Sequence, residues 1–231
     1  LISYMDGKEL IEAAKNRNRQ VIVDLNWNVP TNRVVLVDLW MSSASQESMR
    51  FLRDWAPTRR AFNHAIAFTP HYAVFRMPGD VHGSYSDLCS SSSGAFCAED
   101  PDGPGPITGK MVVDEDVRQL CIHELYSAKR GHSRLADADG DKLHYAREYW
   151  AYMESLLGEC PLHGEGDKRF GAACSRNLMQ SVGIDVAMVE DCVMRTKADK
   201  LSRQLTDVAW SPRALRINGW RYAGAVDVDV V

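Results

Sequence analysis

The chain has 231 residues, of which 45% are hydrophobic and 25% charged, a composition typical of a globular protein with a substantial core. Its formal net charge of −4 does not favour nucleic acid as a partner, and no apolar run approaches the ~20 residues that span a bilayer. Because it does not begin with methionine, we expect a piece of a longer protein.

The first part of the chain predicts a helix followed by two strands. Leu10, Ile11 and Ala14 have helical spacing, and the apolar run "QVIVDLNW" from Gln20 predicts a strand. After a turn marked by asparagine and proline, Val34 to Trp40 is apolar on nearly every residue. Such a run is typical of a central strand that is covered on both faces.

A helix and a third strand are expected next. From Ser45 the pattern becomes helical, with Met49, Leu52 and Trp55 on one side, and Ser45 is positioned to cap the helix at its N-terminus. The run "AIAFTPHYAVFRM" from Ala65 predicts the third strand. A proline within it indicates a sheet edge, a bulge or a later strand start.

The rest of the chain is mostly helical and ends in a hairpin. A loop rich in Gly, Pro and Ser follows the third strand, and helical patterns then cover the ranges 114–129, 143–157, 169–181 and 185–200. The segment "SPRALRINGWRYAG" from Ser211 holds Asn218-Gly219 between two short runs. Asn-Gly in that position is a strong signal for a tight β-hairpin.

This order of elements predicts an α/β fold with a thioredoxin-like core. Without the helical segments, β-α-β is followed by β-β and a proline precedes the third core strand, as in thioredoxin-like folds. We therefore assign residues 21–231 to a thioredoxin-like domain with a disulfide-stapled helical insertion at about residues 80–205.

The corner between the second strand and its helix lacks the chemistry of a redox enzyme. In thioredoxin-like oxidoreductases a cysteine at this helix N-terminus has a lowered pKa. Here Ser45-Gln46-Glu47-Ser48 stands at about that place, and no cysteine precedes Cys89. The corner therefore cannot cycle between dithiol and disulfide, and we expect no catalytic residue there. The serines are either the remnant of a redox pair or an ordinary helix cap.

Ser211 and Pro212 are candidates for binding an extended peptide. A cis Pro212 would expose the backbone of Ser211 for pairing with such a peptide. The alternative is that this proline only sets the hairpin.

The six cysteines predict disulfides in an oxidising compartment, the alternative being six buried thiols. If the last two helices are antiparallel, Cys174 faces Cys192, Cys89 closes a loop with Cys97, and Cys121 reaches Cys160. This is one connectivity among those that six cysteines allow. A metal site of Cys160, His163 and Cys174 lacks the short paired spacings of zinc sites, so no metal is expected there.

A calcium loop is a further candidate at Asp137 to Glu148. Asp137, Asp139, Asp141 and Glu148 match the acidic positions of an EF-hand loop, but Lys142 stands where that loop needs glycine. The sequence favours an acidic solvated loop, so no cofactor is expected in this chain, and calcium is the alternative.

Several segments together resemble the central lumenal region of plant-type vacuolar sorting receptors. They are "FTPHY", "GAFCAEDPDG", "VRQLCIHEL", "SVGIDVAMVEDCV" and "ALRINGWRYAG", in this order along the chain. The resemblance implies a thioredoxin-like region between a protease-associated domain and EGF-like repeats, followed by one membrane span. Residues 1–20 are similar to the end of a protease-associated domain.

The resemblance implies a non-enzymatic domain that takes part in sorting soluble proteins to the vacuole. Its expected partners are soluble cargo proteins or their sorting peptides, in the lumen of the Golgi and the prevacuolar compartment, with membrane attachment only outside this chain. The alternative function is a disulfide oxidoreductase or redox chaperone of the secretory pathway that uses a later cysteine pair. A calcium-responsive interaction domain is a third hypothesis.

Overall fold

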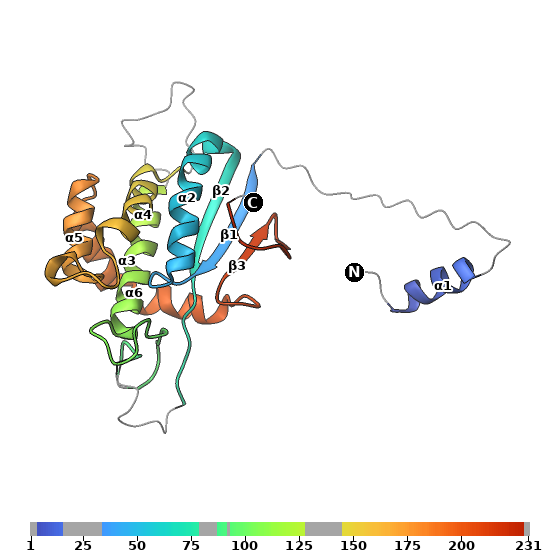
Figure 1. Cartoon of the computed structure of the whole chain (residues 1–231), viewed down its shortest axis with the longest axis horizontal. Coiled ribbons are helices and arrows are strands. Elements are labelled where there is room, and N and C mark those ends of the chain that lie inside the picture. Colours follow the sequence, from blue (N-terminus) through green and yellow to red (C-terminus); the bar gives the residue numbers. More distant parts are fainter. Residues whose placement is uncertain (1–3, 16–33, 79–86, 92, 128–144, 229–231) are drawn as a thin grey trace. The chain divides into compact units, whose positions relative to one another are not determined.

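The computed structural model describes residues 4–15, 34–78, 87–91, 93–127 and 145–228 (Figure 1). The chain divides into two units, residues 1–32 and 33–231. The described part of the first unit is the helix α1 (Tyr4–Lys15), which confirms helical structure there. The strand expected from Gln20 lies outside the described residues, and the assignment of residues 1–20 to a protease-associated domain stays a prediction.

The second unit contains one mixed four-stranded sheet in the order β2-β1-β3-β4 (Figure 1). Its strands are β1 (Val35–Met41), β2 (Ile66–Tyr72), β3 (Ala214–Ile217) and β4 (Trp220–Arg221). β1 is parallel to β2, β3 is antiparallel to β1, and β4 is antiparallel to β3. The predicted β-α-β and β-β halves therefore meet in one sheet, with β1 at its centre.

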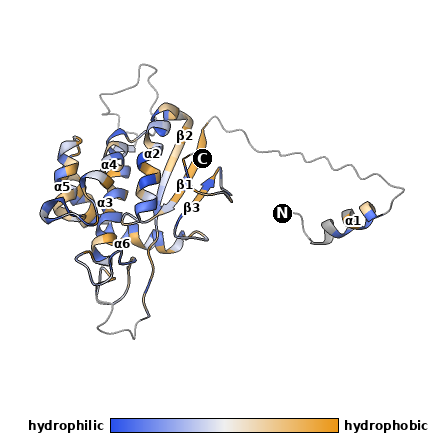
Figure 2. Cartoon of the chain, viewed as in Figure 1, coloured by the Kyte–Doolittle hydropathy of each residue, from blue (hydrophilic) through white to orange (hydrophobic). Residues whose placement is uncertain are grey.

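The helix α2 (Gln46–Phe62) makes the crossover between β1 and β2. The Oγ of Ser45 accepts a hydrogen bond from the backbone N–H of Ser48 at 3.2 Å, so the predicted N-cap is confirmed. Met49, Leu52 and Trp55 are buried on one side of the helix. Figure 2 shows β1 and β2 as hydrophobic strands and polar residues on the visible side of α2.

Four α-helices lie in the described part of the insertion, as expected, although their bounds differ. They are α3 (Gly109–Ser127), α4 (Arg147–Glu159), α5 (Ala172–Ser181) and α6 (Val186–Thr206). α3 begins earlier than predicted because the Oγ1 of Thr108 accepts from the N–H of Met111 at 3.3 Å and caps the first turn. α6 runs further because Leu201 and Gln204 are buried in its last turns.

The helices pack around a buried group of aromatic side chains. α2 packs on α4, and the ring of Trp55 lies 5.5 Å from that of Trp150 in an edge-to-face contact. The ring of Phe68 on β2 lies 4.9 Å from Trp150. These contacts join the insertion to the sheet in one continuous core.

Side chains from the helices close the outer edge of β2. Arg59 Nη2 donates to the carbonyl oxygen of Ile66 at 2.8 Å, and the N–H of Tyr72 donates to Gln204 Oε1 at 2.7 Å. His123 forms a hydrogen bond with the backbone of Phe68. At these positions the edge strand is not free to pair with a peptide.

All six cysteines form disulfides, and two of the three predicted pairs are wrong. Cys89 pairs with Cys97, as expected, whereas Cys121 pairs with Cys192 and Cys160 with Cys174. The prediction failed because α6 packs along α3 rather than lying mainly against the short α5. Cys174 instead meets Cys160 at the end of α4. The disulfide also leaves no thiolate for the alternative metal site with His163.

Candidate functional site

The corner after β1 is built from backbone and hydroxyl groups. The N–H of Ser43 donates to Asp116 Oδ1 on α3 at 3.1 Å, and Ser43 Oγ donates to the carbonyl oxygen of Val112 at 3.3 Å. The Oγ of Ser48 is buried and has no hydrogen-bond partner among the described residues. With every cysteine in a disulfide elsewhere, the corner offers no thiol for exchange.

Asp116 is a fully buried carboxyl group beneath this corner. Its pKa is raised to about 8, mainly by burial and also by the neighbouring Glu115 and Asp114 carboxylates, while the hydrogen bonds with Ser43 act in the opposite direction. Its Oδ2 atom is buried without a hydrogen-bond partner in the described structure. The carboxyl group therefore keeps its proton at neutral pH and holds the corner as a neutral hydrogen-bond partner.

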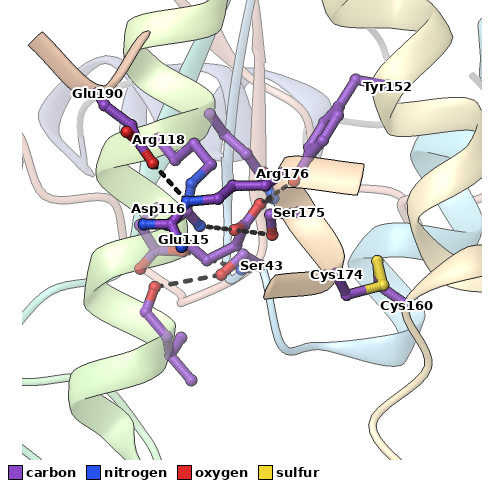
Figure 3. A network of polar contacts seen from close by, with 12 residues as sticks. Ser43, Glu115, Asp116, Arg118, Tyr152, Cys160, Cys174, Ser175, Arg176 and Glu190 are labelled. Carbon is purple, nitrogen blue, oxygen red and sulfur yellow. Dashed lines mark hydrogen bonds and ion pairs between the residues drawn. A yellow bond between two sulfur atoms is a disulfide. The ribbon is translucent and has the colours of Figure 1, made fainter. Parts of the chain in front are cut away.

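The buried carboxylate of Glu115, the residue before Asp116, joins three helices of the insertion (Figure 3). Tyr152 on α4 and Gln119 on α3 donate to Glu115 Oε1 at 2.6 Å and 2.9 Å. Ser175 on α5 donates to Oε2 at 2.7 Å, and Arg118 forms an ion pair with the same oxygen. Because each oxygen has strong donors, this buried charge is compensated.

A hollow of about 270 Å³ lies beside the loop that leads into β3. Its lining comes from the end of β1, the segment after β2 and the loop after α6: Trp40, Ser42, Tyr72, Ala73, Val74, Phe75, Glu99, Val208, Ala209, Trp210, Ser211 and Pro212. The two predicted peptide-binding residues, Ser211 and Pro212, thus line one concave surface. Of the two alternatives for Pro212, the cis bond is not observed, because the described residues contain no cis peptide bond.

Charged and aromatic groups surround the hollow. The ring of His71 stacks on Trp40 at 4.2 Å, and its nitrogens lie 3.4 Å from Asp38 Oδ1 and 3.3 Å from Asp207 Oδ2. The indole N–H of Trp40 donates to the carbonyl oxygen of Asp207 at 2.7 Å. These contacts hold the loop after α6 against the end of the sheet.

Two guanidinium groups lie over the indole rings at this end of the sheet. The Arg216 Cζ atom lies 4.6 Å from the ring centre of Trp40 and 5.7 Å from that of Trp210, and Arg221 Cζ lies 4.6 Å from Trp210. We call Trp40, Trp210, Arg216 and Arg221 the tryptophan–arginine cluster. No local pattern in the sequence predicts this cluster, because its members come from distant segments.

The calcium candidate is not brought together in the described structure. Asp137, Asp139 and Asp141 lie outside the described residues, and Glu148 lies in the first turn of α4. Within the described ranges, no group of three or more His, Cys, Asp or Glu side chains is arranged to hold a metal ion. Calcium binding by this segment stays a prediction.

The profile of the vacuolar sorting receptor thioredoxin-like domain matches residues 35–228. The chain belongs to this family. It is 26% identical to vacuolar-sorting receptor 1 of Pisum sativum over 216 residues, which cover 86% of the chain and 31% of that relative. It is 24% identical to vacuolar-sorting receptor 6 of Arabidopsis thaliana over 211 residues, covering 84% of the chain and 30% of the relative. No solved structure matches the chain.

The family match confirms the resemblance and the thioredoxin-like fold. The chain spans about 31% of the length of the pea receptor. Among the described residues, no helix is long and apolar enough to cross a membrane. The matched region contains the whole sheet, the insertion, the hollow and the tryptophan–arginine cluster.

Proposed function

We propose that this domain is a non-enzymatic lumenal part of a sorting receptor that takes part in binding soluble proteins and sorting them to the vacuole. The observation that carries the proposal is the absence of cysteine from Ser42 to Ser48 in a domain of this family. A thioredoxin-like enzyme needs its thiolate at that helix N-terminus, and an alcohol does not ionise there at neutral pH. The described corner therefore has no thiol for redox chemistry, whether its serines are the remnant of a redox pair or an ordinary helix cap.

The disulfides support a location in the lumen of the secretory pathway, and from the family we infer that this lumen is that of the Golgi and the prevacuolar compartment. Three disulfides in one domain fit an oxidising compartment, since cytosolic thiols are kept reduced. The partners that we infer are soluble cargo proteins or their sorting peptides, and the domain itself needs no redox cofactor for this role.

A domain exchange in the pea receptor tests the proposal. Residues 35–228 replace the matching region of vacuolar-sorting receptor 1, and delivery of a soluble vacuolar reporter is measured in plant cells. We expect cells with the exchanged receptor to deliver the reporter to the vacuole, whereas cells with a receptor that lacks the region should secrete it. Secretion by an exchanged receptor that retains its three disulfides and its normal location would contradict the proposal.

The alternative redox function is tested by counting reactive thiols. The unreduced protein is denatured with an alkylating reagent, and its intact mass is measured. We expect no added label, because a disulfide sulfur does not react with the reagent. Uptake of two labels per molecule in a homogeneous preparation would instead favour the function of a disulfide oxidoreductase.

A further inference from the structure

The tryptophan–arginine cluster places two positive charges side by side. Arg216 on β3 and Arg221 on β4 are direct partners in the antiparallel register. Like charges at directly opposed positions destabilise a sheet unless other groups compensate them. The indole of Trp210 lies close to both guanidinium groups, and cation–π attraction supplies part of that compensation.

Neither guanidinium group has an acidic partner in the described part of the chain. The residue opposite Arg216 on β1 is Asp38, but its Oδ1 lies against the ring of His71 rather than against the arginine. No ion pair or side-chain hydrogen bond joins Arg216 or Arg221 to another described residue. Stacking on an indole orients the plane of a guanidinium and leaves its N–H donors available for a carboxylate.

The hollow is continuous with the cluster, because Trp40 and Trp210 belong to both. Its other walls include the apolar side chains of Val74 and Phe75, and Val208 and Trp210 at its border are 61% and 37% exposed. Its volume of about 270 Å³ lies at the lower limit of small-molecule pockets. It suits one or two side chains of a peptide better than a drug-sized ligand.

The charges around the hollow give it a polarity. Glu99 lines it on the side of the segment that follows Cys97, whereas Arg216 and Arg221 lie on the side of β3 and β4 without an acidic partner among the described residues. The nearby carboxylates of Asp38 and Asp207 lie against the ring nitrogens of His71. A carboxylate is repelled from the first side and attracted to the second. Exposed tryptophan and arginine beside a small pocket are also the residues that most often dominate binding at protein interfaces.

We propose that the cluster and the hollow together bind an acidic peptide segment of a partner protein. In this arrangement a Glu or Asp carboxylate of the peptide is held by Arg216 and Arg221, and a neighbouring apolar side chain of the peptide enters the hollow beside Trp210. The proposal rests on the proposed function, because it names the chemistry of the cargo segment that this domain would recognise.

Binding of a defined peptide to the whole chain tests this proposal. The probe is a fluorescently labelled, capped peptide in which two glutamates flank a phenylalanine, and its counterpart has lysines in place of the glutamates. Fluorescence anisotropy gives the dissociation constants at low and high salt. The variants are Arg221→Gln, Trp210→Ala and the double variant Arg216→Gln/Arg221→Gln, with Arg50→Gln, an exposed α2 position, as the matched control.

We expect the acidic peptide to bind and the lysine peptide not to bind. Arg221→Gln should weaken binding at least fivefold, and the double variant and Trp210→Ala at least tenfold, while Arg50→Gln changes it less than twofold. Equal binding of both peptides, binding unaffected by the double variant, or no binding of the acidic peptide would overturn the proposal. So would a dimer in sedimentation experiments that the double variant abolishes, because a second copy would then occupy the cluster.

The reporter assay separates this proposal from the proposed function. If the exchanged receptor delivers the reporter but the acidic peptide does not bind, the peptide site is wrong and the sorting role stands. If the peptide binds as expected but the exchanged receptor secretes the reporter, the peptide site stands and the sorting role is wrong.

Discussion

Cys121 on α3 and Cys192 on α6 are joined by a disulfide across a sequence separation of 71 residues, with their Cα atoms 6.0 Å apart. The bond ties the first helix of the insertion to the last. α6 in turn leads into the loop of Ser211 and Pro212, which lines the hollow. The other two disulfides close loops of only 8 and 14 residues.

Loss of the Cys121–Cys192 disulfide should destabilise the protein more than loss of Cys160–Cys174. From the loop lengths alone, we expect the variant C121S/C192S to lose about 4 kcal/mol of unfolding free energy and C160S/C174S to lose about 3 kcal/mol. Chemical denaturation of both variants measures these losses. Peptide mapping of the unreduced wild type supplies the control, because any pairing other than the three bonds described would contradict the premise.

Replacing Glu115 by glutamine should cost about 3–5 kcal/mol of stability, because Arg118 would be left as a buried charge without its partner. Glu190→Gln is the matched control. Glu190 pairs with Arg176, but both side chains are about half exposed, so we expect a loss of about 0–1 kcal/mol. Urea denaturation compares the two variants. Equal losses would show that burial does not strengthen the Glu115 contacts.

Much of the fold is predictable because its signals are local. The apolar run of β1, the Ser45 cap and the Asn218-Gly219 turn each depend on a few adjacent residues, and all three are present in the structure. The order of these elements was then enough to indicate the thioredoxin-like core. The bounds of α3 and α6 were less accurate, since caps and tertiary burial decide where helices end.

The site depends on contacts between distant segments, which a single sequence does not reveal. The disulfide of Cys121 follows from the packing of α6 on α3, and the tryptophan–arginine cluster joins β1 to residues after α6. One missed signal was local. Glu115 and Asp116 lie in "MVVDEDVRQL" with apolar residues on both sides, a pattern that indicates acidic side chains within a buried helix.

Asp116 should make stability fall as pH rises. Its carboxyl group has a folded pKa of about 8 against an ordinary value of 3.8, so between these values the folded state binds one more proton than the unfolded state. The stabilisation that protonated Asp116 gives to the folded state is complete below about pH 4 and is lost as pH rises through about 8. Relative to the Asp116→Asn variant, the wild type should lose up to about 1.4 kcal/mol per pH unit across this window.

His123 should make the stability of the protein rise with pH, opposite to Asp116, over part of the same pH range. Its pKa is lowered from 6.5 to about 3, mainly by burial and also by the charges of Arg59 and Lys200, so the unfolded state binds the extra proton between these values. Relative to His123→Gln, the wild type should therefore gain stability with rising pH up to about 6.5. Unfolding curves of the three proteins from pH 4 to 9 measure both slopes. Parallel stability profiles for Asp116→Asn and the wild type would mean that this carboxyl group is ionised in the fold.

Replacing Gly219 by alanine should destabilise the protein more than the same replacement of a helical glycine with equal space around it. Gly219 has φ of +80° in the turn between β3 and β4, and a Cβ atom there would meet nothing within 4 Å. Alanine would therefore cost about 1 kcal/mol through backbone strain alone. Gly158 in α4 also has nothing within 4 Å, but its backbone is helical, so Gly158→Ala should stabilise the protein by roughly 0.5 kcal/mol. Thermal unfolding should shift in opposite directions for the two variants, and a loss for both would contradict the assignment of the cost at Gly219 to its positive φ.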